Sequence, residues 1–519
     1  MTNAAASPER HLEQPFGDYT AIMAEWAAIK PDEPALSDDH GTINWGDMMD
    51  RVDRMAAAMQ RDGLQRGQAV AILGTTGIPY ALAYLAAIRA GGCAAPLTTS
   101  ATPTQLAAMM ADSGAMHLFI DAAKADDLAD QPLPTMTRVM LDGARDGAPG
   151  LDDWMAPAGT KPTHRAPDER DPFNIIYSSG TTGTPKGIVH SHIMRWRQAA
   201  GGFKSIYGPE SRSLLSTPLY SNTTLAVFLP TMVWGGHARL MGKFDAKRWL
   251  ELASANRITH TMLVPVQYQR LLRHEDFDKH DLSSMEQKFC TSAPFSAELK
   301  GEAVRRFPGT LNEIYGMTEG GVVCMLMAHK FPDKLHTVGQ PLPGHELIVL
   351  GDDDQPVAPG EKGVLCGRSP TMMLGYKNQP EKTREMEWRD AEGNLWLKTG
   401  DIGIVDADGF VEIVGRAKDM IISGGFNIYP VDLEAVLLEE PEVAEAAVVG
   451  VPSEQWGETP VGFIVAAAGQ SADPDAILTR VNPRLGKTQR LSALHLIDEM
   501  PRSHIGKLLK TELRERLGV

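Results

Sequence analysis

The feature that most constrains this chain is a loop rich in glycine and hydroxyl side chains, residues 177–187, with the sequence YSSGTTGTPKG. It follows residues 172–177, a short apolar run typical of a buried strand. Glycines let the backbone turn tightly and expose its N–H groups, while serine and threonine hydroxyls add hydrogen-bond donors. Lys186 adds a positive charge that suits a phosphate oxygen. The loop therefore predicts a site that wraps a polyphosphate.

This loop differs from the Walker A loop of many nucleotide-binding proteins. The Walker A pattern has four residues between its glycines and continues with Gly-Lys-Ser/Thr. Here two residues separate Gly180 from Gly183, and Lys186 is followed by Gly187. No Gly-x-Gly-x-x-Gly pattern closes a first βα unit either. On its own the loop is also compatible with an ordinary surface turn, so further motifs must decide.

Four further motifs follow the loop along the chain. They are YGMTE at 315–319, TGD at 399–401, GRAKD at 415–419 and PRSHIGK at 501–507. The loop and these motifs, in this order, resemble the adenylate-forming (AMP-binding) enzymes, which include acyl- and aryl-CoA ligases, adenylation domains and luciferases. The resemblance extends over essentially the whole chain.

The composition limits the partners of this chain. Its 519 residues are 43% hydrophobic and 22% charged, which is typical of a globular protein with two or more domains. A net charge of −16 argues against nucleic acid as a partner, so local donors must hold any phosphate. Four scattered cysteines indicate reduced thiols. With no signal peptide or membrane span evident, we expect a cytoplasmic protein, and a homodimer stays open.

The pattern of apolar runs predicts an α/β fold. Strands alternating with helices indicate parallel sheets covered by helices, and short strands at 338–414 indicate a small antiparallel β-barrel or sheet. We expect a large N-terminal AMP-binding domain, residues 1–417, and a small mobile α+β lid domain, residues 418–519. The resemblance places the hinge between them at Lys418. Residues 121–171, rich in Asp, Ala, Gly and Pro, are interpreted as a surface connection.

The resemblance implies an ATP-dependent carboxylic acid:CoA ligase. Such an enzyme joins the acid to AMP with release of pyrophosphate, and then forms an acyl-CoA thioester with release of AMP. Because the attacking carboxylate is already an anion, the first step needs positioning and charge neutralisation rather than a general base. The implied cofactor is Mg²⁺, and the implied partners are a small-molecule carboxylic acid, ATP and CoA.

Matching the motifs residue by residue gives the expected catalytic groups. Lys507 would reach the α-phosphate and the attacking carboxylate, Thr318 would contact the α-phosphate, and Glu319 would hold Mg²⁺. The full set of expected ATP and AMP contacts is Ser178, Ser179, Gly180, Thr181, Thr182, Gly183, Thr184, Lys186, Ser292, Ala293, Pro294, Glu313, Ile314, Tyr315, Gly316, Met317, Thr318, Asp401, Arg416 and Lys507.

Within that set the resemblance implies separate roles for the base, the sugar and the second half-reaction. Tyr315 would stack on adenine, and Asp401, beside Arg416, would accept hydrogen bonds from the ribose hydroxyls. Rotation about Lys418 would withdraw Lys507 and bring in a glycine-containing loop for the pantetheine arm of CoA. That loop consists of Ser423, Gly424, Gly425 and Phe426.

The resemblance also places the side chain of the acid. The expected acyl pocket comprises Gly201, Tyr220, Ser221, Asn222, Thr223, Gly316, Gly321 and Val322. Many relatives carry a histidine or another aromatic gate where this chain has Ser221, which indicates a wider pocket. None of these positions offers Lys or Arg, which disfavours dicarboxylic acids. We expect a bulky apolar aryl or aryl-alkyl monocarboxylate. His190 and His192 are interpreted as structural rather than as pocket residues.

Several alternatives stay open from the sequence. A medium-chain fatty acid is the alternative substrate, and a carrier protein is the alternative acceptor. The chain continues for twelve residues after Lys507 without a carrier domain, which favours CoA. A non-catalytic nucleotide-binding regulator would keep the loop, although the retained Lys507, Glu319 and Asp401 argue against it. A luciferase-type oxygenase shares the same motifs.

Overall fold

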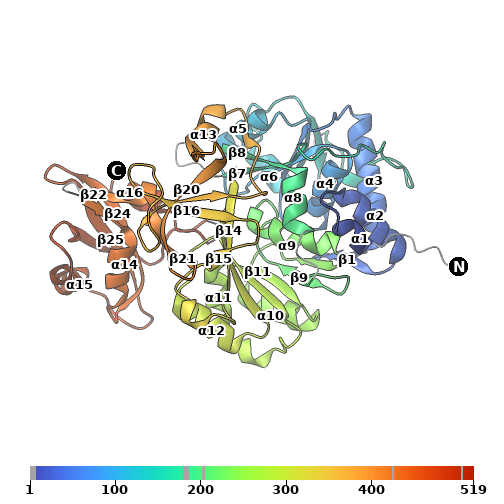
Figure 1. Ribbon diagram of the computed structural model, residues 1–519. Coiled ribbons are helices and arrows are strands. Elements are labelled where there is room, and N and C mark those ends of the chain that lie inside the picture. The colour runs from blue at the N-terminus through green and yellow to red at the C-terminus, as the bar shows by residue number, and fades with distance from the viewer. Residues whose placement is uncertain (1–7, 146, 179–185, 201–204, 424–425, 504–505) are drawn as a thin grey trace.

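The computed structural model describes residues 8–519 except 146, 179–185, 201–204, 424–425 and 504–505. Its N-terminal part contains two large sheets with helices on and between them, and its C-terminal part contains a separate small sheet (Figure 1). The small C-terminal part, orange to red, lies beside a small antiparallel sheet formed within residues 346–416 and opposite the N-terminal helices. The α/β fold expected from the sequence is confirmed.

The first sheet positions the phosphate loop. Its strand order is β18-β8-β7-β4-β3-β5-β6, and the pairs from β7 to β6 are parallel whereas β7, β8 and β18 pair antiparallel. The strands are β18 (Gly375–Tyr376), β8 (Lys186–Ser191), β7 (Pro172–Ser178), β4 (Cys93–Pro96), β3 (Ala69–Leu73), β5 (His117–Ile120) and β6 (Thr137–Met140). Helices cover both faces, which explains why β3 reads AVAIL and is buried throughout.

One expectation about this region is wrong. Residues 121–171 are not a plain surface connection, because they contain α6 (Ala122–Asp127), α7 (Leu151–Trp154) and β6, which extends the first sheet by parallel pairing with β5. Met140 and Trp154 are buried there. These elements are only four to six residues long, and the Asp, Ala, Gly and Pro around them mask their short apolar runs.

The second sheet supplies most of the other candidate residues. Its order is β15-β14-β13-β12-β11-β9-β10-β1-β2, parallel from β13 to β1 and antiparallel at both ends. The strands are β15 (Gln340–Pro341), β14 (Gly320–Met327), β13 (Thr310–Met317), β12 (Gln287–Cys290), β11 (His260–Leu263), β9 (Arg212–Leu215), β10 (His237–Leu240), β1 (Pro34–Ser37) and β2 (Thr42–Asn44).

The helices of the N-terminal part bury their apolar faces against these sheets. The largest hydrophobic cluster joins α2, α3, α4, α8 and α9 to strands of both sheets, so the main core lies between the sheets. The helices are α1 (Pro8–Leu12), α2 (Tyr19–Ile29), α3 (Trp45–Arg61), α4 (Ile78–Arg89), α5 (Pro103–Ser113), α8 (His192–Ala199), α9 (Asn222–Val233), α10 (Ala246–Ala255), α11 (Pro265–Leu272), α12 (Ala297–Arg306) and α13 (Pro380–Met386).

Side-chain caps fix where several of these helices begin. The α5 helix starts with a capping box, in which Thr102 and Gln105 satisfy each other's backbone N–H groups, and ends at Gly114 in the left-handed conformation. Ser191 accepts from Met194 N at the start of α8. Both N-cap residues, Thr102 and Ser191, carry a hydroxyl group of the kind that is favoured at the start of a helix.

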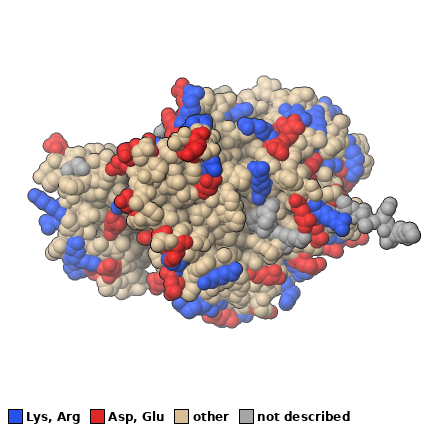
Figure 2. Space-filling view, viewed as in Figure 1, with Lys and Arg blue, Asp and Glu red and all other residues tan. Residues whose placement is uncertain are grey.

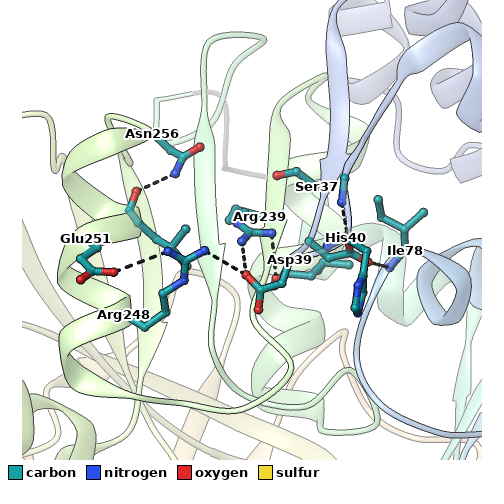
Figure 3. A network of polar contacts seen from close by, with 12 residues as sticks. Ser37, Asp39, His40, Ile78, Arg239, Arg248, Glu251 and Asn256 are labelled. Carbon is teal, nitrogen blue, oxygen red and sulfur yellow. Dashed lines mark hydrogen bonds and ion pairs between the residues drawn. The ribbon is translucent and has the colours of Figure 1, made fainter.

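A polar network ties the outer edge of the second sheet to neighbouring helices (Figure 3). Asp39, in the turn after β1, pairs with Arg239 of β10 at 2.5 Å and with Arg248 of α10 at 3.3 Å. The preceding Asp38 accepts from Ile78 N at the start of α4. Although burial opposes the shift, hydrogen bonds from both arginines lower the pKa of Asp39. The turn thus joins three elements that are far apart in sequence.

The third sheet forms the small antiparallel part. Its order is β16-β17-β20-β19, with β21 paired to β20, and every pair is antiparallel. The strands are β16 (Glu346–Leu350), β17 (Gly363–Arg368), β20 (Leu395–Val405), β19 (Glu387–Arg389) and β21 (Val411–Arg416). The antiparallel sheet expected at about 338–414 is confirmed.

The C-terminal part has its own sheet and cores. The sheet order is β23-β22-β25-β24 with β26 beside β25, and two apolar clusters cover its faces. The elements are β22 (Ile421–Ser423), β23 (Phe426–Ile428), α14 (Pro430–Leu438), β24 (Val443–Ser453), β25 (Gly457–Ala466), α15 (Pro474–Val481), β26 (Ala493–Leu496) and α16 (Lys510–Glu515).

The surface carries both signs of charge without a single basic field on the face shown in Figure 2. Acidic and basic side chains are interspersed around an uncharged central area. Among the described residues, no helix combines the length and the apolar character that crossing a bilayer requires. All four cysteines are buried and unpaired, as expected from their spacing.

Candidate active site

A β-hairpin presents the phosphate loop. β7 and β8 pair antiparallel up to Ser178 and Lys186, so both ends of the loop are held at one edge of the first sheet. Lys186 Nζ lies 5.2 Å from the ring centroid of Tyr376, which belongs to the neighbouring strand β18. Six of the expected loop contacts lie outside the described residues: Ser179, Gly180, Thr181, Thr182, Gly183 and Thr184.

The turn after β13 lies beside this hairpin. Tyr376 Oη donates to Glu319 Oε1 at 2.6 Å, which connects the ring below Lys186 to the expected metal ligand. His190 of β8 is buried, and its Nε2 lies 2.7 Å from the backbone oxygen of Thr318. Burial and the neighbouring charge of Arg195 hold the pKa of His190 well below its usual value. Thr318 and Glu319 are therefore fixed from two directions.

Glycine makes the turn geometrically possible. Gly320 has a φ of 87°, and a Cβ there would lie 1.9 Å from the backbone oxygen of Thr371. Only glycine fits such a close approach in the left-handed region. Met373 N donates to Glu319 O at 2.9 Å, so the segment that carries Met373 also holds the backbone of the turn.

The next candidate residues on β13 face two different environments. Glu313 is buried and forms an ion pair of 2.5 Å with Lys300 of α12. Burial raises the pKa of Glu313 to about 7, although Lys300 opposes the shift. Its carboxylate is thus committed to α12 rather than to a ligand. Ile314 packs against the main core, and Gly316 and Met317 end the strand opposite β14.

Three candidate residues from separate motifs meet at the third sheet. Tyr315 Oη donates to Asp401 Oδ2 at 2.8 Å, and Arg416 Nε lies 3.0 Å from Asp401 Oδ1. Asp401 and Arg416 are paired across β20 and β21. Asp401 is buried, whereas the Arg416 side chain is 43% exposed. Each carboxylate oxygen has two lone pairs, so Asp401 keeps acceptor capacity for hydroxyl groups.

Lys507 lies in the same neighbourhood although it belongs to the C-terminal part. Its pKa is lowered by partial desolvation and by Arg416 and Lys418, whereas Asp401 and Asp419 raise it. Its loop is held by Ser503 N donating to Lys507 O at 2.8 Å. The preceding Gly506 is buried, with a φ of 74°, and a Cβ there would lie 3.1 Å from Val266 Cγ1 at the start of α11. The lysine loop thus rests on the N-terminal part.

The expected adenine and acyl segments touch each other. Ser292 Oγ and Thr223 Oγ1 lie 2.6 Å apart, and Ser292 has a φ of 80° in a region that serine rarely adopts. Ser221 caps α9 by accepting from Thr223 N, so its hydroxyl serves the helix. Val322 is buried in β14, and Gly321 has a φ of 83°. Ala293 and Pro294 follow Ser292 in the same loop, and Gly201 lies outside the described residues.

Sequence reasoning missed a buried cation next to this pocket. Arg195 of α8 is only 2% exposed and donates from Nη1 to Asn222 Oδ1 at 2.8 Å and to Gln198 Oε1 at 3.0 Å. Its Nε donates to Asn174 Oδ1 at 2.8 Å. An arginine within the otherwise buried face of a short helix was the available signal. Tyr376 and His190 were also missed as groups that position Glu319 and Thr318.

The expected CoA segment lies away from these residues. Ser423 is buried in β22, and Phe426 in β23 is 64% exposed. In Figure 1, β22 lies on the outer side of the C-terminal part, remote from β14. Gly424 and Gly425 lie outside the described residues. Lys418 is exposed in a short 3₁₀ turn, Ala417–Asp419, directly after β21.

Comparison with known proteins agrees with this geometry. Residues 23–377 match the AMP-binding enzyme family, and residues 432–507 match the AMP-binding enzyme C-terminal domain. The chain is 32% identical over 499 residues to a feruloyl-CoA synthase of Amycolatopsis sp, covering 95% of this chain and 97% of that protein. It is 29% identical over 511 residues to an indoleacetate–CoA ligase of Aromatoleum aromaticum, covering 95% and 98%.

The fold is similar to that of solved enzymes as well. The amide bond synthetase McbA from Marinactinospora thermotolerans superposes with a TM-score of 0.84 at 27% identity, covering 96% of this chain and 99% of that one. The chain therefore belongs to the AMP-binding enzyme family. Within the adenylate-forming superfamily, it falls in the acyl- and aryl-CoA ligase branch.

Proposed function

We propose that this protein activates an aromatic carboxylic acid with ATP and transfers the acyl group to CoA. One observation carries the proposal: a series of contacts, with an electrostatic interaction as its last step, links Lys186 at the phosphate loop to the C-terminal lysine. Lys186 lies over Tyr376, which donates to Glu319. Four residues before Glu319, Tyr315 bonds to Asp401, which pairs with Arg416 and is within electrostatic range of Lys507. These relationships support a single site bordered by the five distant motifs.

The arrangement suits the formation of an acyl-adenylate. A carboxylate oxygen of the acid attacks the α-phosphorus of ATP, and the bond to the pyrophosphate leaving group breaks. We assign Lys507 to the α-phosphate and the attacking carboxylate, where its positive charge neutralises the charge that develops in the transition state. Lys186 serves the departing phosphates. The hydroxyl of Thr318, held by His190 through the backbone, is assigned to the α-phosphate.

The nucleoside is assigned to the groups around Asp401. A buried carboxylate held by Tyr315 and Arg416 is preorganised to accept two hydroxyl hydrogen bonds from ribose. The Tyr315 ring and the loop of Ser292 are assigned to the two faces of adenine. Because the Glu313 carboxylate pairs with Lys300, we assign no side-chain contact with the nucleotide to Glu313.

The residues near Glu319 fit a magnesium ion that is shared with phosphate groups. Mg²⁺ prefers hard oxygen ligands and is commonly held by one or two protein carboxylates together with substrate phosphates. Glu319 offers such a carboxylate, with Oε1 bonded to Tyr376. No group of three or more potential ligands occurs among the described residues, so this single carboxylate would act with ATP oxygens. When bound, the ion supplies charge neutralisation at the phosphates.

The second half-reaction requires a different placement of the C-terminal part. The thiol sulfur of CoA attacks the carbonyl carbon of the acyl-adenylate, AMP leaves, and the thiol proton is released. We propose residues 1–417 and 418–519 as the domains, with a hinge at Lys418 that exchanges Lys507 for the loop of Ser423 and Phe426. Strand β22, which ends at Ser423, is remote from β14 in Figure 1, so one arrangement cannot present both. We also propose a cytoplasmic location for the protein, because its four cysteines are unpaired and the cytoplasm keeps thiols reduced.

An acid panel with two readouts tests the function. Purified protein is incubated with ATP, Mg²⁺ and CoA and with benzoic, cinnamic, indole-3-acetic and octanoic acids, and pyrophosphate release and thioester formation are measured. We expect the fastest thioester formation with an aromatic acid. A preference for octanoic acid would change the assigned substrate class from aromatic acids to fatty acids. Thioester formation only on a phosphopantetheinylated carrier protein would show that the acceptor is a carrier protein rather than CoA. Background rates with every acid would contradict the proposal.

A further inference from the structure

Several buried side chains beside the acyl segment leave polar atoms without a partner. Arg195 Nη2, Tyr80 Oη, Tyr84 Oη and Tyr220 Oη are each enclosed and make no hydrogen bond within the described structure. Such atoms are uncommon in folded proteins because each loses its bonds to water. Tyr220 faces the hydroxyl groups of residues 98–100 without reaching bonding geometry with them.

These atoms lie close to one another rather than scattered through the core. Tyr80 and Tyr84 are one turn apart on α4 and therefore share a face. Tyr80 is close enough to Tyr84 and Tyr220 for their charges to affect its pKa, and Tyr84 is likewise coupled to Arg195. Elements α4, α8 and the start of α9 thus contribute to one polar cluster. We refer to Tyr80, Tyr84 and Arg195 as the polar recess.

The charge in this recess is not compensated by the protein. Arg195 makes no ion pair with any described Asp or Glu, and its three side-chain acceptors are the neutral amides of Asn174, Gln198 and Asn222. A guanidinium keeps its charge in proteins, and burying it without a counter-charge is costly. The free N–H groups of Nη2 and the two phenolic hydroxyls can all donate hydrogen bonds. The recess therefore lacks an acceptor.

The recess adjoins the segment assigned to the acid. Asn222, which accepts from Arg195 Nη1, and Tyr220, which is coupled to Tyr80, both belong to the expected acyl pocket. The reacting carboxylate, in contrast, is assigned to the region of Thr318 and Lys507. His190 lies between these regions: its Nε2 is 2.7 Å from the backbone oxygen of Thr318, and its Nδ1 is 3.4 Å from the side-chain nitrogen of Asn174, whose oxygen accepts from Arg195. The recess is thus placed at the far end of the acid.

We propose that the polar recess receives an oxygen acceptor on the substrate acid, at the end opposite the carboxylate that is activated. This inference rests on the proposed function and narrows its substrate class to acids with a distal phenol, ketone or second carboxylate oxygen. Arg195 and the two tyrosines would donate to that oxygen, so they are specificity-determining residues. The expectation of a wholly apolar acid, based on the pocket positions alone, did not take Arg195 into account.

A matched series of cinnamic acids tests the proposal. The ring carbon opposite the side chain carries hydrogen, hydroxyl, acetyl or carboxylate, and kcat/KM is measured as pyrophosphate release with ATP and CoA. We expect at least one oxygenated acid to exceed the unsubstituted acid by about tenfold or more. Preference for the carboxylate would identify an anionic acceptor, and preference for hydroxyl or acetyl would identify a neutral one.

Variants then assign the preference to the recess. Tyr84→Phe and Tyr80→Phe each remove one oxygen atom, and Arg195→Met removes the charge at similar volume. The ratio of kcat/KM between the oxygenated and unsubstituted acids should fall about tenfold in Tyr84→Phe and further in Arg195→Met. Tyr268→Phe is the control, because the Tyr268 hydroxyl is also buried but donates to Phe289 O. It should leave the ratio unchanged.

Two results would overturn the inference while leaving the ligase function intact. One is equal kcat/KM for all four acids in the unmodified protein, and the other is a preference that survives in every recess variant. If Arg195→Met does not fold, the two tyrosine variants decide. Background turnover of all four acids would count against the proposed function instead. Binding of the same acids would then be compared by calorimetry, and equal affinities would overturn the recess as well.

Discussion

His190 Nε2 lies 2.7 Å from the backbone oxygen of Thr318, so a neutral imidazole on β8 holds the turn between β13 and β14. Because His190 is fully buried, water cannot take the place of this hydrogen bond. The contact joins the strand after the phosphate loop to the turn that carries Glu319. His190 acts as a positioning residue, because it reaches the assigned phosphate site only through Thr318.

Replacing His190 should therefore slow the chemistry more than it weakens ATP binding. For His190→Ala we expect kcat for pyrophosphate release to fall about ten- to a hundredfold, with a smaller change in the KM for ATP. Steady-state kinetics at saturating acid measure both. His237→Asn, at a histidine of β10 in the second sheet that is bonded to Ser37, is the control. A rise in the KM for ATP with unchanged kcat would contradict the positioning role.

The bond from Tyr376 to Glu319 predicts a dependence on magnesium. Tyr376→Phe removes the donor at 2.6 Å but keeps the ring over Lys186. Without this bond the Glu319 carboxylate is less well oriented, so we expect adenylation to slow about tenfold at limiting Mg²⁺. ATP–pyrophosphate exchange measured over a range of Mg²⁺ concentrations gives the effect. Identical curves for the variant and the unmodified protein would show that Tyr376 does not act on Glu319.

Asp401 is predicted to serve the nucleotide rather than the fold alone. Asp401→Asn keeps the shape and an acceptor for Tyr315 but removes the negative charge opposite Arg416. We expect the KM for ATP to rise about tenfold or more, because two ribose hydrogen bonds weaken. Asp406→Asn, which breaks an ion pair with Lys334 elsewhere in the third sheet, should have little effect. Equal KM values for ATP in both variants would show that Asp401 does not contact the nucleotide.

Some of these relationships could be predicted from the sequence, and others could not. Tyr315, Asp401, Arg416 and Lys507 stand in motifs with an ordered spacing, and the fold brings them together. Tyr376, in contrast, stands in an ordinary two-residue edge strand. Its importance comes from Glu319, 57 residues earlier, and no local pattern encodes that contact.

The phosphate loop shows the same limit. Its sequence predicts a tight turn after a strand, but the pairing of β7 with β8 depends on how the chain returns to the sheet edge.

The charge of Arg195 would place its side chain in solvent, yet α8 packs on both β7 and α9, and the surrounding amides allow the charge to be buried. Burial of a charged residue is a tertiary property.

Buried histidines predict loss of stability in acid. Burial lowers the pKa values of His192, His237 and His260 to about 4. An unfolded histidine has a pKa of about 6.5, so between about pH 6.5 and 4 the unfolded chain binds protons that the folded protein does not. The free energy of unfolding should therefore have its highest value above pH 6.5 and decrease as the pH falls. Each histidine contributes about 1.4 kcal/mol per pH unit in that window.

Urea unfolding at pH 7.5, 6 and 5 measures this dependence. The unfolding midpoint should fall steadily across the three values. His260→Gln removes one titrating group while keeping a donor toward Ile206 O, so its midpoint should depend less on pH. A midpoint that is constant or rises on acidification would contradict neutral burial of these histidines.

The central claim is that Lys507, from the C-terminal part, acts at the α-phosphate only during adenylation. The decisive measurement compares both half-reactions in Lys507→Ala: ATP–pyrophosphate exchange with the acid, and thioester formation from supplied acyl-adenylate and CoA. Lys487→Ala, at a lysine that lies over Trp456, is the control. We predict that Lys507→Ala lowers exchange about a hundredfold or more and largely spares thioester formation. Equal loss of both half-reactions would contradict the account.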